Sequence, residues 1–235
     1  MSFKDFPAPQ PVALADALRW QASPDWTFET KADGKRALLS AGELRGRALR
    51  YPLPGPLPAT LDGCALDGEL VGKAYFAFDL LEANGQDLRR QPLRERRAAL
   101  LALQPLFPDW IRPIPAARPG QPGGDYLQAV LRAGAEGCVA KRLSAPYGCQ
   151  WFKAKRVETF DCVAAERDMA RGSIRLALAG EDCGWLPCRA AFDGIRLGDV
   201  LEISALGRHA SGKFREARLV RVRTDKPATD CKAYA

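Results

Sequence analysis

Several features that would place the chain in a zinc-binding, exported or membrane class are scarce. The 235 residues include one histidine, His209, and seven cysteines that form no CxxC pair, so a structural zinc site is not expected. An odd number of cysteines without a secretory leader favours reduced thiols in the cytoplasm over a disulfide framework. The first 20 residues contain no long apolar run, which predicts neither export nor a membrane span.

The overall composition is typical of a globular protein. Hydrophobic residues make up 47% of the chain and charged residues 27%, and the length allows one large domain or two smaller ones. The net charge of +7 would suit nucleic acid or an acidic membrane surface, but a basic balance alone identifies no partner.

The stretch with the most distinctive chemistry runs from Glu29 to Arg36, reads ETKADGKR, and lies between apolar runs at 26–28 and 37–39. A free lysine amine has a pKa of ~10.4 and becomes nucleophilic when it is desolvated or crowded by other cations. Attack on a nucleotide α-phosphate also needs cations that neutralise the phosphate oxygens, usually with a metal. A nucleophilic Lys31 therefore predicts carboxylates and more Lys or Arg elsewhere. The alternative is a plain Asp-Gly hairpin turn between paired strands.

Such groups follow along the chain. Glu69 lies in a strand-like run, where a carboxylate is costly unless it is paired or bound to metal, although it could also face outward. Glu136 and Lys141 flank an apolar core in EGCVAKR. Lys153 and Lys155 alternate on a predicted strand and so share one side of it, where they would form a phosphate clamp or a solvent-facing pair.

The expected domains differ in secondary structure: helices are predicted in the first and only short strands in the second. Helices are predicted at 92–103, with its arginines Arg94, Arg96 and Arg97 on a solvated face, and at 125–133. After residue 156 the chain holds five short strand-like runs and no strong helix, a pattern that indicates a small OB-type barrel.

We therefore predict an α+β protein with domains at 1–156 and 157–235. The first would be built of antiparallel sheets with helices, and the second would be the C-terminal barrel. Residues 206–226 hold seven Lys or Arg against two acids, a local charge of +5. They form a candidate contact strip for a phosphate backbone, with a solvated loop and edge strand as the alternative.

Six short motifs, in a fixed order, resemble those of the ATP-dependent DNA ligases. This family lies within the covalent nucleotidyltransferase superfamily, with RNA ligases and capping enzymes. The motif KxDGxR matches at Lys31, Asp33, Gly34 and Arg36, an acid within DGE at Glu69, an aromatic motif at Phe78, EGxxxK at Glu136 and Lys141, Lys-x-Lys at Lys153 and Lys155, and RxDK at Arg223, Asp225 and Lys226.

The resemblance implies a nucleotidyltransferase (adenylation) domain, an OB-fold domain and three chemical steps. Lys31 would attack the α-phosphate of ATP to give a lysyl-AMP and pyrophosphate. The AMP would pass to the 5′-phosphate at a nick in duplex DNA, and the 3′-OH would then displace it to seal the strand.

The resemblance also implies roles for individual residues. Glu29 would meet the adenine amino group, and Phe78 would stack on the adenine ring. The catalytic residues would be Lys31, Asp33, Arg36, Glu69, Glu136, Lys153 and Lys155. Those that bind ATP would be Glu29, Thr30, Lys31, Arg36, Glu69, Phe78, Lys141, Lys153, Lys155, Arg223, Asp225 and Lys226. The last three would act on the β- and γ-phosphates during the first step.

Glu69 and Glu136 would hold Mg²⁺ or the ribose, with Mn²⁺ as an alternative metal because both metals take oxygen ligands. The expected DNA contacts are Arg208, Lys213 and Arg215 of the basic strip, together with Arg47, the nearest candidate for the Ser-Arg motif of the family.

Departures from the family pattern shape the remaining expectations. The chain has no room for the added DNA-binding domain of larger ligases, which predicts a minimal two-domain enzyme. We expect it to act as a monomer, and an accessory protein could supply further DNA contacts. No nicotinamide-binding module or zinc finger is visible, so ATP is expected rather than NAD⁺. The open alternatives are an RNA ligase or RNA-end adenylyltransferase, a guanylyltransferase, and a catalytically silent OB-type binder.

Overall fold

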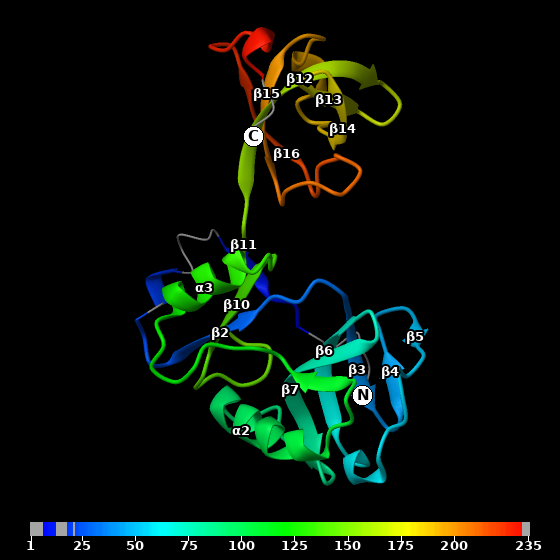
Figure 1. Cartoon of the computed structure of the whole chain (residues 1–235), viewed down its shortest axis with the longest axis vertical. Coiled ribbons are helices and arrows are strands. Elements are labelled where there is room, and N and C mark those ends of the chain that lie inside the picture. Colours follow the sequence, from blue (N-terminus) through cyan, green and yellow to red (C-terminus); the bar gives the residue numbers. More distant parts are fainter. Residues whose placement is uncertain (1–6, 13–17, 21, 232–235) are drawn as a thin grey trace. The chain divides into compact units, whose positions relative to one another are not determined.

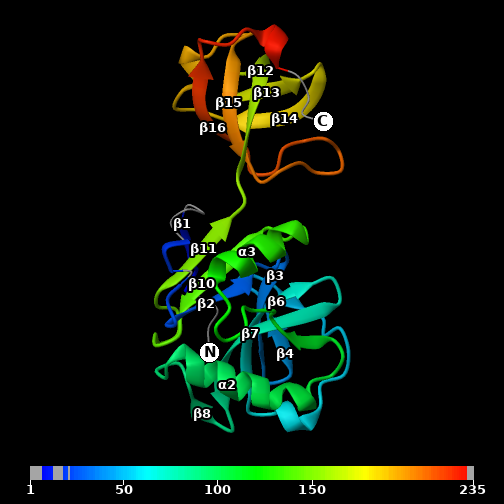
Figure 2. The ribbon, with the colours of Figure 1, turned by 60° about the vertical axis from the view of Figure 1, so that its left-hand side comes forward.

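The computed structural model describes residues 7–12, 18–20 and 22–231, and Figures 1 and 2 show it in two views. It divides into two compact units, residues 1–155 and 156–235, each with its own hydrophobic core. Among the described residues, no helix has both the length and the apolar character needed to cross a membrane. The division into an adenylation domain and an OB-fold domain stays a prediction.

The larger sheet of unit 1 has seven strands in the order β5-β4-β3-β6-β7-β8, with β9 parallel to β7. Burial alternates along β7, where Tyr75 and Ala77 are fully buried while Phe76 and Phe78 are partly exposed, because successive side chains point to opposite faces. The strands are β3 (Lys35–Ser40), β4 (Glu43–Arg45), β5 (Arg50–Tyr51), β6 (Ala65–Val71), β7 (Ala74–Ala83), β8 (Gln86–Asp87) and β9 (Ile111–Pro113).

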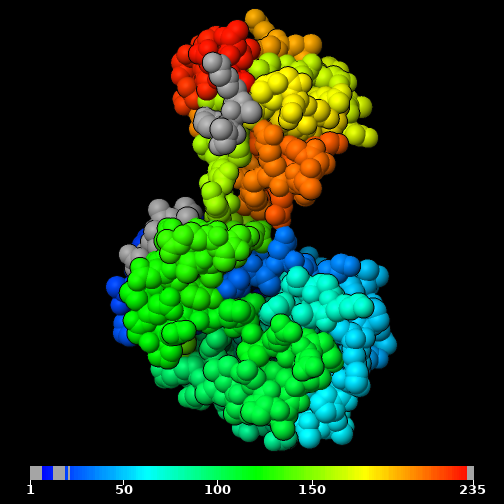
Figure 3. All heavy atoms as spheres, viewed as in Figure 1, coloured from blue at the N-terminus to red at the C-terminus, as the bar shows by residue number. Residues whose placement is uncertain are grey.

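The smaller sheet of unit 1 has four strands in the order β1-β11-β10-β2. Strand β1 is parallel to β11, and the other pairs are antiparallel. Figure 3 shows N-terminal residues, in blue, between the green and cyan residues of this unit, so segments distant in the sequence lie side by side. The strands are β1 (Gln10–Val12), β2 (Trp26–Thr30), β10 (Gly137–Arg142) and β11 (Trp151–Lys155).

The strands on either side of Lys31 do not form a hairpin, so the plain-turn interpretation of Asp-Gly is wrong. Strand β2 pairs with β10, whereas β3 pairs with β4 and β6, and residues 31–34 cross from one sheet to the other. Gly34 is needed here because a Cβ atom would lie 2.3 Å from the carbonyl oxygen of Leu70. A close approach to β6, rather than a tight turn, explains this glycine.

Helix α2 (Leu93–Leu103) confirms the predicted helix but corrects the expectation for its arginines. Arg96 lies on the buried side with Leu93 and Leu100, at the spacing of one helix face. It forms a two-pronged salt bridge with Asp79 of β7, with Nε–Oδ1 at 2.7 Å and Nη2–Oδ2 at 2.9 Å. Both side chains are 0% exposed, and this pair ties α2 to the sheet.

Helix α3 (Gly123–Arg132) packs on β2, close to the predicted range. Its first residue must be glycine, because a Cβ atom there would lie 2.0 Å from the ring of Phe28. Phe28, Leu127 and Ala140 form part of the small core beneath the helix.

Unit 2 contains the five predicted strands in one antiparallel sheet, ordered β14-β13-β12-β15-β16. Its core includes Leu176, Leu186 and Leu201. The end strands β14 and β16 come within 8 Å between Cα atoms, but no pairing joins them among the described residues, so closure into a barrel stays a prediction. The strands are β12 (Glu158–Asp168), β13 (Ser173–Leu178), β14 (Glu181–Pro187), β15 (Val200–Ala205) and β16 (Arg218–Arg223).

Candidate active site

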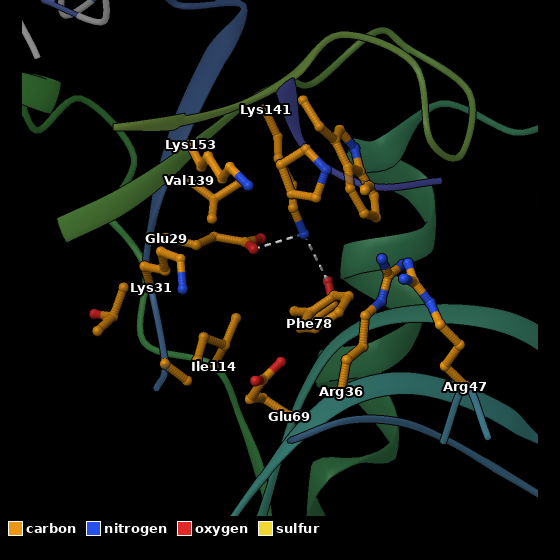
Figure 4. A pocket seen from close by; sticks show the side chains of 15 residues that line it. Glu29, Lys31, Arg36, Arg47, Glu69, Phe78, Ile114, Val139, Lys141 and Lys153 are labelled. Carbon is orange, nitrogen blue, oxygen red and sulfur yellow. Dashed lines mark hydrogen bonds and ion pairs between the residues drawn. The ribbon is translucent and has the colours of Figure 1, made fainter. Parts of the chain in front are cut away.

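Unit 1 contains a cavity of about 250 Å³ lined by strands of both its sheets. Figure 4 shows Lys31, Lys153 and Glu29 directed into the same space. Residues from six different strands thus line the same cavity. The predicted site residues that line the cavity are Glu29, Thr30, Lys31, Arg36, Arg47, Glu69, Phe78, Lys141 and Lys153.

Lys31 follows the last residue of β2 and is held by both backbone and side-chain contacts. Its backbone N–H donates to the carbonyl of Gly137 at 3.0 Å, and its Nζ donates to Oε2 of Glu136 at 2.5 Å. Gly137 has φ +152, and a Cβ atom would lie 2.1 Å from the carbonyl oxygen of Ala154. Glycine is therefore required beside Glu136, and it keeps that carboxylate next to Lys31.

Glu136 lies between two lysines. Its Oε1 is 2.7 Å from Nζ of Lys155, and its side chain is only 6% exposed. Burial opposes ionisation, but hydrogen bonds from Lys155 and Lys31 outweigh it, so the pKa of Glu136 lies below its ordinary value. Glu136 is therefore an anion that holds the two cations in place.

Glu69 is the second carboxylate near Lys31, and its pKa shifts the other way. Its Oε1 accepts a hydrogen bond from the backbone N–H of Gly34 at 3.2 Å. Burial raises the pKa of Glu69, and the nearby charge of Lys31 only partly offsets this effect. Two carboxylates with opposite shifts thus flank one lysine.

Glu29 is buried between two cations at another wall of the cavity. Its Oε2 lies 2.6 Å from Nζ of Lys141, and its Oε1 accepts a hydrogen bond from Nη1 of Arg97 at 2.8 Å. The Lys141 ammonium lies 4.6 Å from the ring centre of Phe78 and 4.3 Å from that of Trp151. This wall therefore presents polar groups beside two aromatic faces.

Arg36 is fixed by partners that the sequence did not reveal. It donates to Oδ1 of Asp67 at 3.1 Å and to Oδ2 at 2.6 Å, and Tyr147 donates its hydroxyl to Oδ2 at 2.6 Å. Because Asp67 is fully buried, the guanidinium is locked beside the cavity. The ring of Phe78 lies 5.5 Å from it.

The lysines of β11 share one side of the strand, as predicted. Lys153 lines the cavity and Lys155 binds Glu136. Thr30 also lines the cavity, with its hydroxyl 2.7 Å from that of Tyr126. Asp33 is exposed and does not line the cavity.

The remaining predicted residues lie in unit 2. Arg223 binds Asp225 at 2.8 Å and Asp161 at 3.3 Å, and Lys226 binds Asp161 at 2.7 Å. The Arg208 guanidinium lies 4.7 Å from the ring centre of Phe214, so part of its surface is used in packing. Lys213 is exposed and Arg215 is half-buried.

Four residues of the site were missed by the sequence reasoning. Asp67 precedes Glu69 by two positions in the same DGE motif, which was the one signal that could have found it. Arg97 lay on the helix face expected to be solvated, and Trp151 opens the strand predicted for the two lysines. Only the folded chain brings Trp151 to the cavity wall and Arg97 and Tyr147 into contact with Glu29 and Arg36, which line it.

Comparison with known proteins relates the chain to DNA ligases. No protein-family model matches it. A protein named probable DNA ligase from Nocardia farcinica is 40% identical over 133 residues, which are 54% of this chain and 24% of that protein. A probable DNA ligase from Kineococcus radiotolerans is 29% identical over 235 residues, 80% of this chain and 46% of that protein. The chain spans less than half the length of these relatives.

Solved structures share the fold. One described as "DNA binding with a minimal scaffold: Structure-function analysis of Lig E DNA ligases" has a TM-score of 0.75 at 18% identity, covering 93% of this chain and 98% of that chain. A "mycobacterial DNA ligase D complexed with ATP and MES" has a TM-score of 0.56 at 19% identity and covers both chains fully, at 100%.

The chain therefore shares the fold of these solved DNA ligase structures, and its cavity is lined by Lys31. In sequence, the chain is similar over part of their length to proteins named probable DNA ligase.

Proposed function

We propose that the chain is an ATP-dependent DNA ligase that seals 5′-phosphate/3′-OH nicks in duplex DNA through a lysyl-AMP intermediate. The observation that carries the proposal is the position of Lys31. It lines a cavity together with Lys153, and its Nζ lies 2.5 Å from Oε2 of Glu136. DNA ligase names among the relatives support the proposal.

In the proposed first step, the Lys31 Nζ forms a bond to the α-phosphorus of ATP as the bond from that phosphorus to pyrophosphate breaks. The Lys31 ammonium must lose one proton to free the lone pair that attacks and a second as the new bond forms. Oε2 of Glu136 is within reach to accept one of them, and the other passes to solvent. Lys153 and Lys155 supply positive charge for the phosphate oxygens.

The wall formed by Glu29, Lys141 and Phe78 is the proposed base subsite. A carboxylate accepts a hydrogen bond from the adenine amino group, an ammonium donates to a ring nitrogen, and an aromatic face stacks on the base. Guanine carries a carbonyl in place of that amino group, so the Glu29 carboxylate would select against it.

The donor set fits a hard divalent cation. Glu69 and Glu136 both lie beside Lys31, and Mg²⁺ is commonly held by one or two carboxylates together with substrate phosphates and water. Among the described residues, no group of three or more His, Cys, Asp or Glu side chains could hold a metal, which suits a metal held jointly with substrate. When bound, Mg²⁺ or Mn²⁺ would neutralise charge on the phosphate oxygens.

We further propose that unit 2 is an OB-fold domain. Counted along the chain, its strands have the spatial order 3-2-1-4-5, and the approach of its end strands fits a partly open five-stranded barrel. Roles of Arg223, Asp225 and Lys226 at the β- and γ-phosphates, a monomeric state, an accessory protein and a cytoplasmic location remain part of this proposal.

The test combines adduct formation with nick sealing. The full chain is incubated with α-phosphate-labelled ATP or GTP and Mg²⁺ at low salt, and then with singly nicked DNA or RNA duplexes. We expect a labelled protein and sealed DNA with ATP, and neither with Lys31→Ala. Lys35→Ala is the matched control, because Lys35 is exposed and does not line the cavity. An adduct on Lys31→Ala, or sealing of RNA nicks alone, would overturn the proposal.

A further inference from the structure

A second and larger hollow lies on unit 1, outside the nucleotide cavity. This groove of about 790 Å³ runs between α2 and the segment that leads from β9 to α3, which passes between the two helices in Figure 1. Arg97 lines the groove and Glu29 lines the cavity, and their 2.8 Å hydrogen bond joins the two walls.

The groove is strongly basic. Arg94 and Arg97 line it from α2, and Arg118 lines it from the opposite segment, while none of the described lining residues is acidic. Arg94 and Arg118 are exposed. Three guanidinium groups therefore face one space, and among the described residues a carboxylate pairs with that of Arg97 but with neither of the other two.

The rest of the groove is largely apolar. Trp26, Leu101 and Pro119 contribute to its surface, and Leu101 is 43% exposed although it is a large apolar side chain. Trp26 is held in place by stacking on Trp20, with ring centres 4.4 Å apart. The groove thus combines arginine side chains with apolar and aromatic surface.

We propose that this groove binds an unpaired nucleic-acid strand. A flexible single strand offers phosphates to the arginines and base faces to the apolar surface, the combination that single-strand sites use. The volume suits about one or two nucleotides. A free polyphosphate would leave the apolar surface uncovered, and a duplex keeps its base faces stacked. The proposal is independent of the adenylation chemistry.

Binding is measured by fluorescence anisotropy of a labelled single-stranded hexathymidylate with the full chain, without ATP. We expect Arg94→Glu/Arg118→Glu to weaken binding by about tenfold or more, because two phosphate contacts become repulsive. Arg132→Glu is the control, since Arg132 is exposed on the same unit but does not line the groove. For Arg94→Gln/Arg118→Gln, the salt dependence of log K should become shallower by about 1.4, or ~0.7 per lost single-strand phosphate contact.

Photocrosslinking shows where on the chain the strand binds. A photoreactive 4-thiothymidine strand should crosslink to peptides that contain Trp26 or Leu101, and unchanged thermal melting would show that the variants fold. Equal loss in Arg132→Glu, or crosslinks confined to other peptides, would overturn the proposal. So would inorganic triphosphate competing as well as the unlabelled strand, or a blunt duplex losing affinity to the same extent. Nick sealing is not the readout, so failure of the proposed ligase activity would leave this test intact.

Discussion

Nζ of Lys31 lies 2.5 Å from Oε2 of Glu136, whose other oxygen is 2.7 Å from Nζ of Lys155. One carboxylate therefore orients the proposed nucleophile and one of the proposed phosphate-binding cations. Beyond its proposed role in holding a metal, Glu136 is hydrogen-bonded to the Lys31 amine and could accept its proton.

Glu136→Gln should slow adduct formation by about 10²–10⁴-fold, the usual contribution of a positioned proton acceptor. The amide keeps the shape of the carboxylate but is a far poorer base. Single-turnover labelling with ATP measures the effect. Glu43→Gln is a suitable control, because Glu43 also pairs with two arginines but lies at the surface of unit 1. An unchanged labelling rate in Glu136→Gln would remove the proton-acceptor role.

The two carboxylates beside Lys31 should have opposite effects on stability. The lowered pKa of Glu136 gives stability that is present above the unfolded-state pKa and is lost as pH falls through the folded value. The raised pKa of Glu69 means that the folded state binds its proton more tightly, so stability falls as pH rises from the ordinary value of 4.5 through the folded value.

At pH 7, Glu136→Gln should therefore destabilise the chain by about 1–3 kcal/mol, because charge-assisted hydrogen bonds to Lys31 and Lys155 are lost. Glu69→Gln should raise the melting temperature slightly while it impairs activity. At acidic pH, below both folded pKa values, each variant should approach the wild type. Thermal melting across pH measures this, and shifts of the same sign at pH 7 would contradict it.

Local patterns in the sequence predicted much of the fold. Alternating polarity located β11 with its two lysines, and apolar spacing after Pro92 located α2. These features depend on neighbours within a few residues, which the sequence displays directly. The motif order also identified most residues that line the cavity.

Long-range pairing could not be predicted in the same way. The partner of β2 is β10, more than 100 residues later, so the Asp-Gly turn signal was misleading. Arg96 was predicted to be solvated because its partner Asp79 lies 17 residues away, on a strand whose buried face could not be identified from the sequence. Asp67 and Tyr147 are 80 residues apart, and only folding shows that they share Arg36.

Arg223 and Lys226 should affect one chemical step more than another. Asp161 holds both side chains in unit 2, at 3.3 and 2.7 Å, and the proposed role is at the β- and γ-phosphates of ATP. Those phosphates leave in the first step, so Arg223→Ala or Lys226→Ala should slow adduct formation by at least tenfold more than sealing of a pre-adenylated nick. Arg221→Ala is a control, because Arg221 pairs with Glu202 and is more exposed. Equal losses in both assays would remove the first-step role.

The buried pair of Arg96 and Asp79 should be the most sensitive ionic contact in unit 1. The guanidinium also donates to the carbonyls of Gln91 and Ala145, at 2.5 and 3.3 Å, so all its contacts depend on the position of α2. Removing either partner leaves an uncompensated buried charge, which costs about 3–5 kcal/mol. Arg96→Met and Asp79→Asn should each lower stability by that amount in urea denaturation.

The double variant Arg96→Met/Asp79→Leu should lose less than the sum of the single losses, because it leaves no unpaired charge. Arg94 lies two residues before Arg96, on the exposed side of the same helix, so Arg94→Met should change stability by no more than about 0.5 kcal/mol. Additive losses in the double variant would mean that the two groups act separately. In that case the attachment of α2 would rest on Leu93 and Leu100 rather than on the ion pair.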